Sequence, residues 1–306
     1  MSASVAELVE RFGAGFVPDV APPYDLRALC RRLGRVPGPL PELPPRIQVR
    51  ILEPTGPRRV DAEPAAVFGV IDGIQPPSRV ACWRGGRPVG LLYVAAGCLE
   101  PASGAARARE ERLLLVVSHL DETWARELGS GVPIAVVRER YPAELVSAIS
   151  ELHRRLRHRL ERDVLGAVRA AGRLVVVDGH LRDVAPGAGA VAGVVKAHPR
   201  QYLGDEREIA NLGEGELSTP FLLPAARDGE ADRFSAYLRL HRAEDAEWPH
   251  GLIRLETTDE GLLEPVASWA LVSRQGPSAG PRWPVHLAST AYCETWLRSR
   301  VPPILS

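Results

Sequence analysis

Two apolar runs of this sequence each end in the dipeptide Asp-Gly, and they constrain the fold more than any other feature. One run leads from Ala65 to Gly73 and the other from Leu174 to Gly179. Apolar runs of this length, bounded by a turn signal, are typical of strands buried on both faces of a sheet. A carboxylate at the end of such a strand lies at the sheet edge, so we expect Asp72 and Asp178 to share one acidic site. The alternative is that each Asp-Gly only starts a turn, which is the commoner meaning of a single copy.

The clearest single element is a long helix predicted from Pro142 to Ala171. Proline suits the first turn of a helix, Gly172 suits its C-terminal cap, and apolar residues recur between them at helical spacing. Glu161 lies beside this apolar stripe, so we expect its carboxylate to face the margin of the sheet. The strand that ends in Asp178 follows directly.

The remaining pattern predicts several strands and a closing helix. Gly85-Gly86 is typical of a two-residue hairpin turn and starts an antiparallel meander after Asp72. The closing helix is predicted from Trp283 to Arg298, with its start at Pro284. The expected strands are Arg46–Leu52, Ala66–Asp72, Arg79–Arg84, Arg87–Ala95, Arg112–Ser118, Pro133–Arg138, Leu174–Asp178, Val191–Val195, Phe234–Leu240 and Leu252–Glu256. Strands and helices in this order indicate an α/β fold.

The N-terminal segment differs in composition from the rest of the chain. Val5 to Phe16 has the pattern of a short amphipathic helix, and Pro18 to Pro45 is rich in proline. Such a density of proline forbids a regular helix and suits an extended arm. We therefore predict an N-terminal helix and Pro-rich arm over residues 1–63, followed by one domain over residues 64–306.

Composition excludes several classes of protein. The chain has 306 residues, of which 45% are hydrophobic and 25% charged, and its formal net charge is zero, which argues against a globally basic nucleic-acid binder. No apolar stretch approaches the roughly 18 residues that span a bilayer, and the polar N-terminus does not resemble a signal peptide. We expect a cytoplasmic protein without a membrane partner. The four cysteines form no C-x-x-C pair, so neither a zinc knuckle nor a disulfide framework is indicated.

Nearly all basic residues of the chain are arginines, and several of them cluster in one segment. Lys196 is the only lysine among 38 lysine and arginine residues, and it follows the strand Val191–Val195. Because an ammonium differs from a guanidinium in shape and hydration, Lys196 is a candidate for a chemical role, with compositional drift as the alternative. The arginine-rich segment from His153 to Arg159 is either a solvated helix face, in which His153 and His158 are also exposed, or a rim that contacts phosphates.

Three acids on rigid elements suit a site for divalent cations. Two such cations roughly 3.5–4 Å apart need several carboxylate oxygens, and they stabilise the attacking and leaving oxygens of a displacement at phosphorus. Three neighbouring carboxylates would otherwise repel each other and raise each other's pKa values. The order of an acidic strand, antiparallel strands, a helix with an inward acid and a second acidic strand is that of ribonuclease-H-like metal sites.

The same residues resemble the NurA nuclease family. The resemblance rests on Asp-Gly after the first core strand, the helical Glu161, and a second strand ending Val-Val-Asp-Gly. Three later motifs continue it in the same order. They are Ala192-Gly-Val-Val-Lys196, Ile253-Arg-Leu-Glu256 and Pro284-Val-His-Leu-Ala288. The resemblance covers the chain from about Ala65 to the C-terminus.

This resemblance implies a ribonuclease-H-like mixed sheet flanked by helices, and a Mn²⁺-dependent, or alternatively Mg²⁺-dependent, two-metal DNA nuclease. It implies 5′-to-3′ exonuclease and single-strand endonuclease activity, a homodimer, and action with a HerA-type hexameric ATPase in DNA end resection for repair or in antiviral defence. The residues that match the family's site are Asp72, Glu161, Asp178 and His286 as metal ligands, with Tyr237 as a looser match. His286 could instead relay a proton or cap the last helix without a catalytic role. Lys196 would favour the negative charge that develops on the phosphate.

One motif departs from the family, and it leaves a second function open. The family's first motif usually continues with Ser, whereas Asp72-Gly73 is followed here by Ile74 and Gln75. A hydroxyl near the metal is thereby lost. The alternative to a nuclease is a catalytically degenerate dimeric adaptor or DNA-end clamp for the ATPase. A nucleotide-binding enzyme is disfavoured because no glycine-rich phosphate-binding motif is present.

Overall fold

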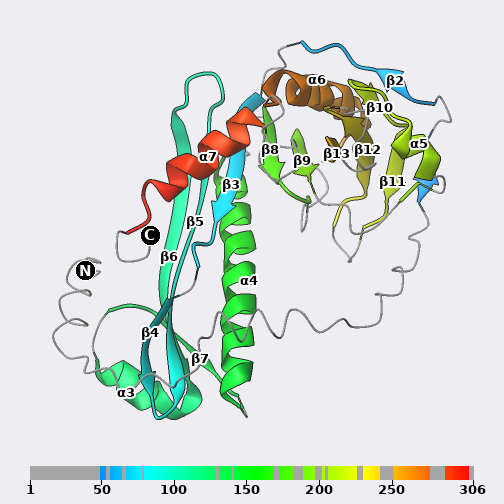
Figure 1. Cartoon of the computed structure of the whole chain (residues 1–306). Coiled ribbons are helices and arrows are strands. Elements are labelled where there is room, and N and C mark those ends of the chain that lie inside the picture. The colour runs from blue at the N-terminus through cyan, green and yellow to red at the C-terminus, as the bar shows by residue number, and fades with distance from the viewer. Residues whose placement is uncertain are drawn as a thin grey trace.

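The computed structural model describes a mixed α/β protein in which one large sheet has helices on both faces (Figure 1). The described residues are 49–52, 56–63, 67–77, 79–128, 131–139, 141–168, 173–181, 189–196, 202–203, 206–225, 230–241, 251–275 and 287–302. The N-terminal helix predicted over Val5 to Phe16 and the proline-rich stretch from Pro18 to Pro45 lie outside these residues.

The sheet contains 13 strands. They are β1 (Arg50–Ile51), β2 (Arg58–Arg59), β3 (Val67–Ile74), β4 (Arg79–Arg84), β5 (Arg87–Leu99), β6 (Ala106–Ser118), β7 (Ile134–Val137), β8 (Leu174–Asp178), β9 (Val191–Val195), β10 (Glu216–Leu217), β11 (Phe221–Leu223), β12 (Arg233–Arg239) and β13 (Leu252–Thr257). The helices of the described ranges are α3 (Glu122–Glu127), α4 (Pro142–Val168), α5 (Glu206–Ala210), α6 (Leu263–Ser273) and α7 (Ala288–Arg298).

The centre of the sheet follows the order β6, β5, β3, β8, β9, β13. Strand β3 is antiparallel to β5 and parallel to β8, and β8 is parallel to β9. The apolar strands β8 and β9 are almost entirely buried, as expected for parallel strands covered on both faces. The two Asp-Gly strands, which are about a hundred residues apart in sequence, are therefore direct neighbours.

The long strand β5 pairs with two different strands along the same edge. Its first part pairs with β4 and its last part with β3, while β6 runs along its other edge. The predicted meander is thus antiparallel, but β3 and β4 pair with successive parts of β5 instead of with each other. Gly85 and Gly86 form the predicted hairpin turn, with φ angles of 50° and 76° that favour glycine.

Helices α4 and α7 cover opposite faces of β3. On one face Ile71 packs with Leu160 and Val164 of α4, and on the other Ile74 packs with Cys293 and Leu297 of α7. Figure 1 shows α4 running along the long strands while α7 crosses β3 and β5. The second half of the sheet has its own core against α6, in which β12 and β13 take part. Any side chain on β3 therefore faces one of two helical layers.

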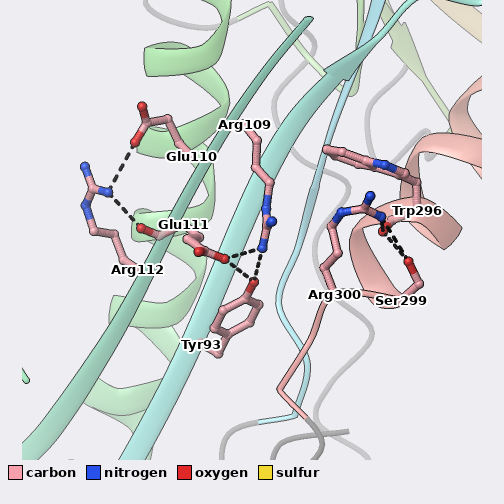
Figure 2. A network of polar contacts seen from close by, with 8 residues as sticks. All are labelled: Tyr93, Arg109, Glu110, Glu111, Arg112, Trp296, Ser299 and Arg300. Atoms are coloured by element: carbon pink, nitrogen blue, oxygen red, sulfur yellow. Dashed lines mark hydrogen bonds and ion pairs between the residues drawn. The ribbon is translucent and has the colours of Figure 1, made fainter. Parts of the chain in front are cut away.

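The outer half of β6 carries charged side chains that pair among themselves (Figure 2). Beyond β5, the only described partner of β6 is β7, which pairs with Leu115–Ser118. In the remaining part, Arg109 contacts Glu111, whose Oε2 accepts a hydrogen bond of 2.7 Å from the hydroxyl of Tyr93. Arg112 pairs with Glu110 at 3.2 Å. Charges on an edge strand oppose pairing with other chains.

Several sequence predictions need correction. Strand β3 continues through Ile74, so Asp72 does not end its strand. Helix α7 begins at Ala288 and not at Pro284, because Leu287 is extended with φ −97° and ψ 133°. Helix α6 was not predicted, because seven of its eleven residues are buried and its apolar residues follow no single stripe. His153 is not solvated, since it is buried against the sheet with Nε2 3.0 Å from the carbonyl oxygen of Tyr93.

The described residues that precede β3 extend the second half of the sheet. Strand β1 pairs with β11 and β2 with β10, both antiparallel. The amide of Glu63 donates a hydrogen bond of 2.8 Å to the hydroxyl of Ser268 on α6. Among the described helices, none combines the length and the apolar character needed to cross a lipid bilayer.

Substitution of two glycines by alanine should change the free energy of unfolding in opposite directions. A Cβ on Gly193 of β9 would lie 2.6 Å from the carbonyl oxygen of Gly179, whereas a Cβ on Gly166 of α4 would meet no atom within 4 Å. We expect Gly193→Ala to lower the free energy of unfolding by about 1–3 kcal/mol, because backbone must move. We expect Gly166→Ala to raise it by about 0.5–1 kcal/mol, because alanine favours a helix interior. Urea denaturation measures both, and equal shifts would contradict the packing described for β8 and β9.

Candidate functional site

Asp72 and Asp178 lie side by side on neighbouring parallel strands. Ile71 pairs with Val177 in the register of β3 and β8, and each aspartate comes one residue later. Paired residues point to the same face of a sheet, so both carboxylates share a face. The register also pairs Asp72 with Gly97, where a Cβ would lie 2.7 Å from Trp296 of α7. The shared face is therefore the one that α7 covers, and the predicted meeting of the two aspartates is found.

The two aspartates differ in their surroundings. Asp72 is 6% exposed, and its Oδ1 accepts a hydrogen bond of 2.7 Å from the amide of Gly73. Burial, and next the charge of Asp178, raise the pKa of Asp72 to about 8, and the charge of Glu161 acts in the same direction. Asp178 ends β8, and 22% of its side chain is exposed. Two carboxylates this close favour a proton or a cation between them.

Lys196 is paired with the second aspartate. Its Nζ donates a hydrogen bond of 2.6 Å to Oδ2 of Asp178 and one of 3.3 Å to Oγ1 of Thr290. Thr290 is buried in the first turn of α7 and donates its own hydroxyl proton to the carbonyl oxygen of Leu287 at 3.0 Å. The lone lysine of the chain thus joins the strand edge to α7, and its charge lowers the pKa of Asp72 in part.

Glu161 approaches the first aspartate from the opposite face of the sheet. A Cβ on Gly73 would overlap Oε1 of Glu161 and lie 2.9 Å from Cγ of Arg157, so the carboxylate of Glu161 rests on the backbone of β3. Its oxygens lie 3.5 Å from Nη1 of Arg157 and 3.2 Å from Nδ1 of His158. Oε1 is buried and has no hydrogen-bond partner in the described part of the chain. Glu161 therefore faces the sheet, as predicted, and not bulk water.

The predicted metal ligands are only partly brought together. Asp72 and Asp178 share the α7 face, while the backbone of β3 separates them from Glu161 on the α4 face. Across the described ranges, no three His, Cys, Asp or Glu side chains are close enough together to hold a metal ion. His286 lies outside the described residues and directly precedes Leu287.

Tyr237 is not brought to the aspartates. It lies on β12, which β13 and β9 separate from β8, and it is 1% exposed. Its ring packs 5.8 Å from that of Phe221, and burial raises the pKa of its phenol to about 12. Its register partner on β13 is Arg254.

A buried ionic cluster around Glu256 is a functional candidate that the sequence alone does not reveal. Glu256 is fully buried on β13, and its carboxylate lies 2.7 Å from Nη2 of Arg254, 3.1 Å from Nη1 of Arg233 and 3.0 Å from Nδ1 of His180. The amide of Leu181 also donates to it at 3.0 Å. The sequence signal was Asp178-Gly179-His180 together with the alternating Arg254 and Glu256. Those residues alone did not show that they converge.

Charge partners reverse the effect of burial on Glu256. Burial by itself would raise the pKa of this carboxyl, but the hydrogen bond of His180 and the charges of Arg254 and Arg233 lower it to about 2. Removing one partner of a buried ion pair usually costs more than the pair contributes. With its pKa lowered to about 2, the carboxyl of Glu256 is ionised at neutral pH.

The arginine-rich face of α4 is mostly a solvated helix face. Arg154 and Arg155 are exposed, and both pair with Glu151, at 2.8 Å and 2.6 Å. Arg157 is the exception, because it turns toward Glu161 and Gly73.

The fold and the site together define an α/β protein whose mixed sheet carries two neighbouring aspartates, one of them buried, on the face that α7 covers. No family model matches the sequence, and no curated protein is similar enough in sequence to count as a match. Among solved structures, the chain is similar to the NurA nuclease from Sulfolobus solfataricus, at 11% sequence identity and a TM-score of 0.43. The similarity covers 80% of this chain and 87% of that one.

The ionised state of Glu256 predicts how stability depends on pH. A carboxyl whose pKa is depressed on folding, here from 4.5 to about 2, stabilises the fold above pH 4.5, and this contribution is lost as the pH falls toward 2. The loss amounts to about 3 kcal/mol. Glu256→Gln should therefore be less stable than the wild type at pH 6 and lose less stability between pH 6 and pH 3.

Urea denaturation at both pH values measures this difference. Glu110→Gln, on the exposed part of β6, is the matched control and should keep the pH dependence of the wild type. An unchanged pH dependence in Glu256→Gln would contradict the ion pairing described for the cluster.

Proposed function

We propose that this chain is a metal-dependent deoxyribonuclease that cleaves phosphodiester bonds as a 5′-to-3′ exonuclease and single-strand endonuclease. The observation that carries the proposal is the placement of Asp72 and Asp178 in register on adjacent parallel strands. Two adjacent carboxylates, one of them buried, suit a divalent cation because hard cations prefer oxygen ligands. Lys196 compensates only part of their charge.

The aspartate pair suits a divalent cation, although no three acidic, histidine or cysteine side chains of the described residues lie close enough together to hold one. The buried Oε1 of Glu161 has no hydrogen-bond partner among the described residues, and it lies against the backbone that carries Asp72. We propose Asp72 and Asp178 as the primary ligands of Mn²⁺, or alternatively of Mg²⁺, with Glu161 and His286 completing a two-metal site. When bound, such ions polarise the phosphodiester and lower the pKa of a bound water.

The other residues near the aspartates orient the site and balance its charge. Lys196 would favour the negative charge that develops on the phosphate, since its ammonium already stands 2.6 Å from Asp178. Thr290 holds that ammonium in place through a hydrogen bond of 3.3 Å. Helix α7 excludes water from Asp72, because Cys293 and Leu297 pack against the same face of the sheet. Tyr237 is proposed to support the site at a distance, since it lies beside Arg254 on the next strand.

The strand order supports a ribonuclease-H-like assignment for the core. Strands β6, β5 and β3 are antiparallel, and β8 and β9 continue parallel to β3. Helix α4 stands between the antiparallel strands and β8 in sequence and carries Glu161. This is the order of elements that the sequence predicted for such a metal site.

The resemblance of the motifs to the NurA family supports proposals about partners. We propose that the substrate is DNA, that the protein acts as a homodimer, and that it works with a HerA-type hexameric ATPase in DNA end processing. Repair and antiviral defence are both compatible settings.

A second candidate is a degenerate adaptor or DNA-end clamp for the ATPase. The observation that favours it is the ion pair of Lys196 with Asp178, which supplies that carboxylate with a cation from the chain itself. In place of the family's serine near Asp72 the chain has Ile74, which is 2% exposed.

Substitution of either aspartate separates the two candidates. For a nuclease, Asp72→Asn and Asp178→Asn should each lower the rate of Mn²⁺-dependent cleavage of an end-labelled oligonucleotide roughly 100-fold or more. Both should keep the circular dichroism spectrum of the wild type. Asp163→Asn, an exposed carboxylate on α4, is the control and should cleave normally. Equal cleavage by all four proteins would exclude the nuclease, and DNA binding without any metal-stimulated cleavage would favour the adaptor.

Gly73→Ala tests the contribution of Glu161 separately. The added Cβ would overlap the carboxylate of Glu161 and lie 2.9 Å from Cγ of Arg157, so these two flexible side chains must move away. We expect cleavage to fall roughly 10- to 100-fold, because small displacements of a reacting group are costly. The melting temperature should change little. Cleavage at the wild-type rate would remove Glu161 from the site, and Gly166→Ala on the open side of α4 is the matched control.

A further inference from the structure

Arg254 is a buried guanidinium whose hydrogen-bonding capacity is only partly used. It is 2% exposed, its Nη2 donates to Oε1 of Glu256 at 2.7 Å, and its guanidinium carbon lies 4.2 Å from the ring centroid of Tyr202. Nη1 is equally buried and has no hydrogen-bond partner in the part of the chain that the structure describes. A buried donor without a partner is rare in native proteins and often marks the place of an unseen ligand or water.

The charge of the cluster points to the sign of that ligand. Two guanidinium groups, Arg254 and Arg233, face the single carboxylate of Glu256. The other hydrogen bond of Arg233 goes to the carbonyl oxygen of Leu181 at 2.8 Å, which does not neutralise it. A net positive charge with little contact with water is costly in free energy unless an anion neutralises it. The arrangement therefore favours an anionic group.

The cluster lies at the same edge of the sheet as the aspartate pair. Arg254 pairs with Val195, the last residue of β9, and Lys196 follows directly. His180 comes two residues after Asp178. Because successive side chains alternate between faces, Arg254 lies on the α4 face while Lys196 lies on the α7 face. The cluster is accessible to solvent at Arg233 and His180, whose side chains are 16% and 29% exposed.

We propose that Arg254, with Arg233 beside it, forms an anion subsite that receives a phosphate group of the DNA strand next to the bond that is cleaved. Glu256 is a positioning residue in this account, since it holds one edge of the guanidinium and leaves Nη1 to donate to the phosphate. A planar guanidinium is well suited to phosphate oxygens. The inference rests on the proposed function, since it takes DNA as the ligand.

Binding measured without metal tests the subsite apart from cleavage. The probe is a fluorescent single-stranded oligodeoxynucleotide, and the readout is anisotropy in EDTA at constant salt. We expect Arg254→Gln to weaken affinity roughly tenfold or more, because it removes a hydrogen bond to a charged group. Arg155→Gln removes one positive charge from the exposed face of α4 and should have a much smaller effect.

Glu256→Gln distinguishes a subsite from a merely structural cluster. Removing the carboxylate frees Arg254 and raises the net positive charge, so affinity for the oligonucleotide should rise, although the fold becomes less stable. A structural role predicts that affinity falls in both variants together with stability. Opposite effects of Arg254→Gln and Glu256→Gln on affinity thus support the subsite, and parallel losses overturn it.

Inorganic phosphate tests whether the subsite binds free phosphate or the phosphate groups of DNA. Phosphate should raise the melting temperature of the wild type, should do so more for Glu256→Gln, and should not do so for Arg254→Gln. Protection by phosphate together with unchanged oligonucleotide binding in all variants would overturn the assignment to DNA. Failure of the wild type to cleave DNA with Mn²⁺, with the binding differences intact, would overturn the nuclease and leave the anion subsite standing.

Discussion

The parallel pairing of β3 with β8 is the constraint on which the site depends. Neighbouring strands lie roughly 4.8 Å apart, so the register that pairs Ile71 with Val177 forces Asp72 and Asp178 together. Two carboxylates at this spacing repel each other, and the pKa of Asp72 is raised to about 8 by burial and by its neighbour. The lone lysine compensates from β9, and α7 is tied to that lysine through Thr290. The strand pairing thus brings two carboxylates together, and the positive charge of Lys196 compensates their negative charge only in part.

Two buried carboxylates of this protein show how partners decide ionisation. Asp72 and Glu256 are both almost inaccessible to water. Burial, followed by the charge of Asp178, holds the pKa of Asp72 high, whereas His180 and two arginines hold that of Glu256 near 2 against the effect of burial. Lys196 compensates the charge beside Asp72 only in part, so this site suits a cation. Glu256 belongs to a cluster with an excess of positive charge. Both carboxylates lie toward the same end of the central strands, but on opposite faces of the sheet.

The central elements were predictable because their signals are local. An apolar run bounded by Asp-Gly predicts a buried strand, and Leu174–Asp178 is found with the predicted bounds. Pro142 predicts the start of α4, and the periodic apolar stripe predicts the inward position of Glu161. The sequence predicts the end of β3 wrongly, because Gly73 has the pattern of a turn signal, whereas in the structure it lies within the strand and lets Glu161 rest on the backbone.

Features that depend on contacts between distant residues could not be predicted from the sequence. Which face a strand residue occupies follows from register, so the placement of Glu161 opposite the aspartate pair could not be derived. Arg254 and Glu256 have the pattern of an ordinary alternating strand. Only folding brings His180 and Arg233 into contact with Glu256. Seven of the eleven residues of α6 are buried, so its apolar residues form no single stripe that the sequence could reveal.

The most direct test of the account is a crystal structure of the protein soaked with Mn²⁺, with anomalous scattering measured for the manganese. The account predicts an anomalous peak at coordinating distance from the carboxylates of Asp72 and Asp178, with Nζ of Lys196 displaced from Asp178 or turned toward a phosphate. A structure in which Lys196 still pairs with Asp178, and no manganese lies between the two aspartates, would contradict it.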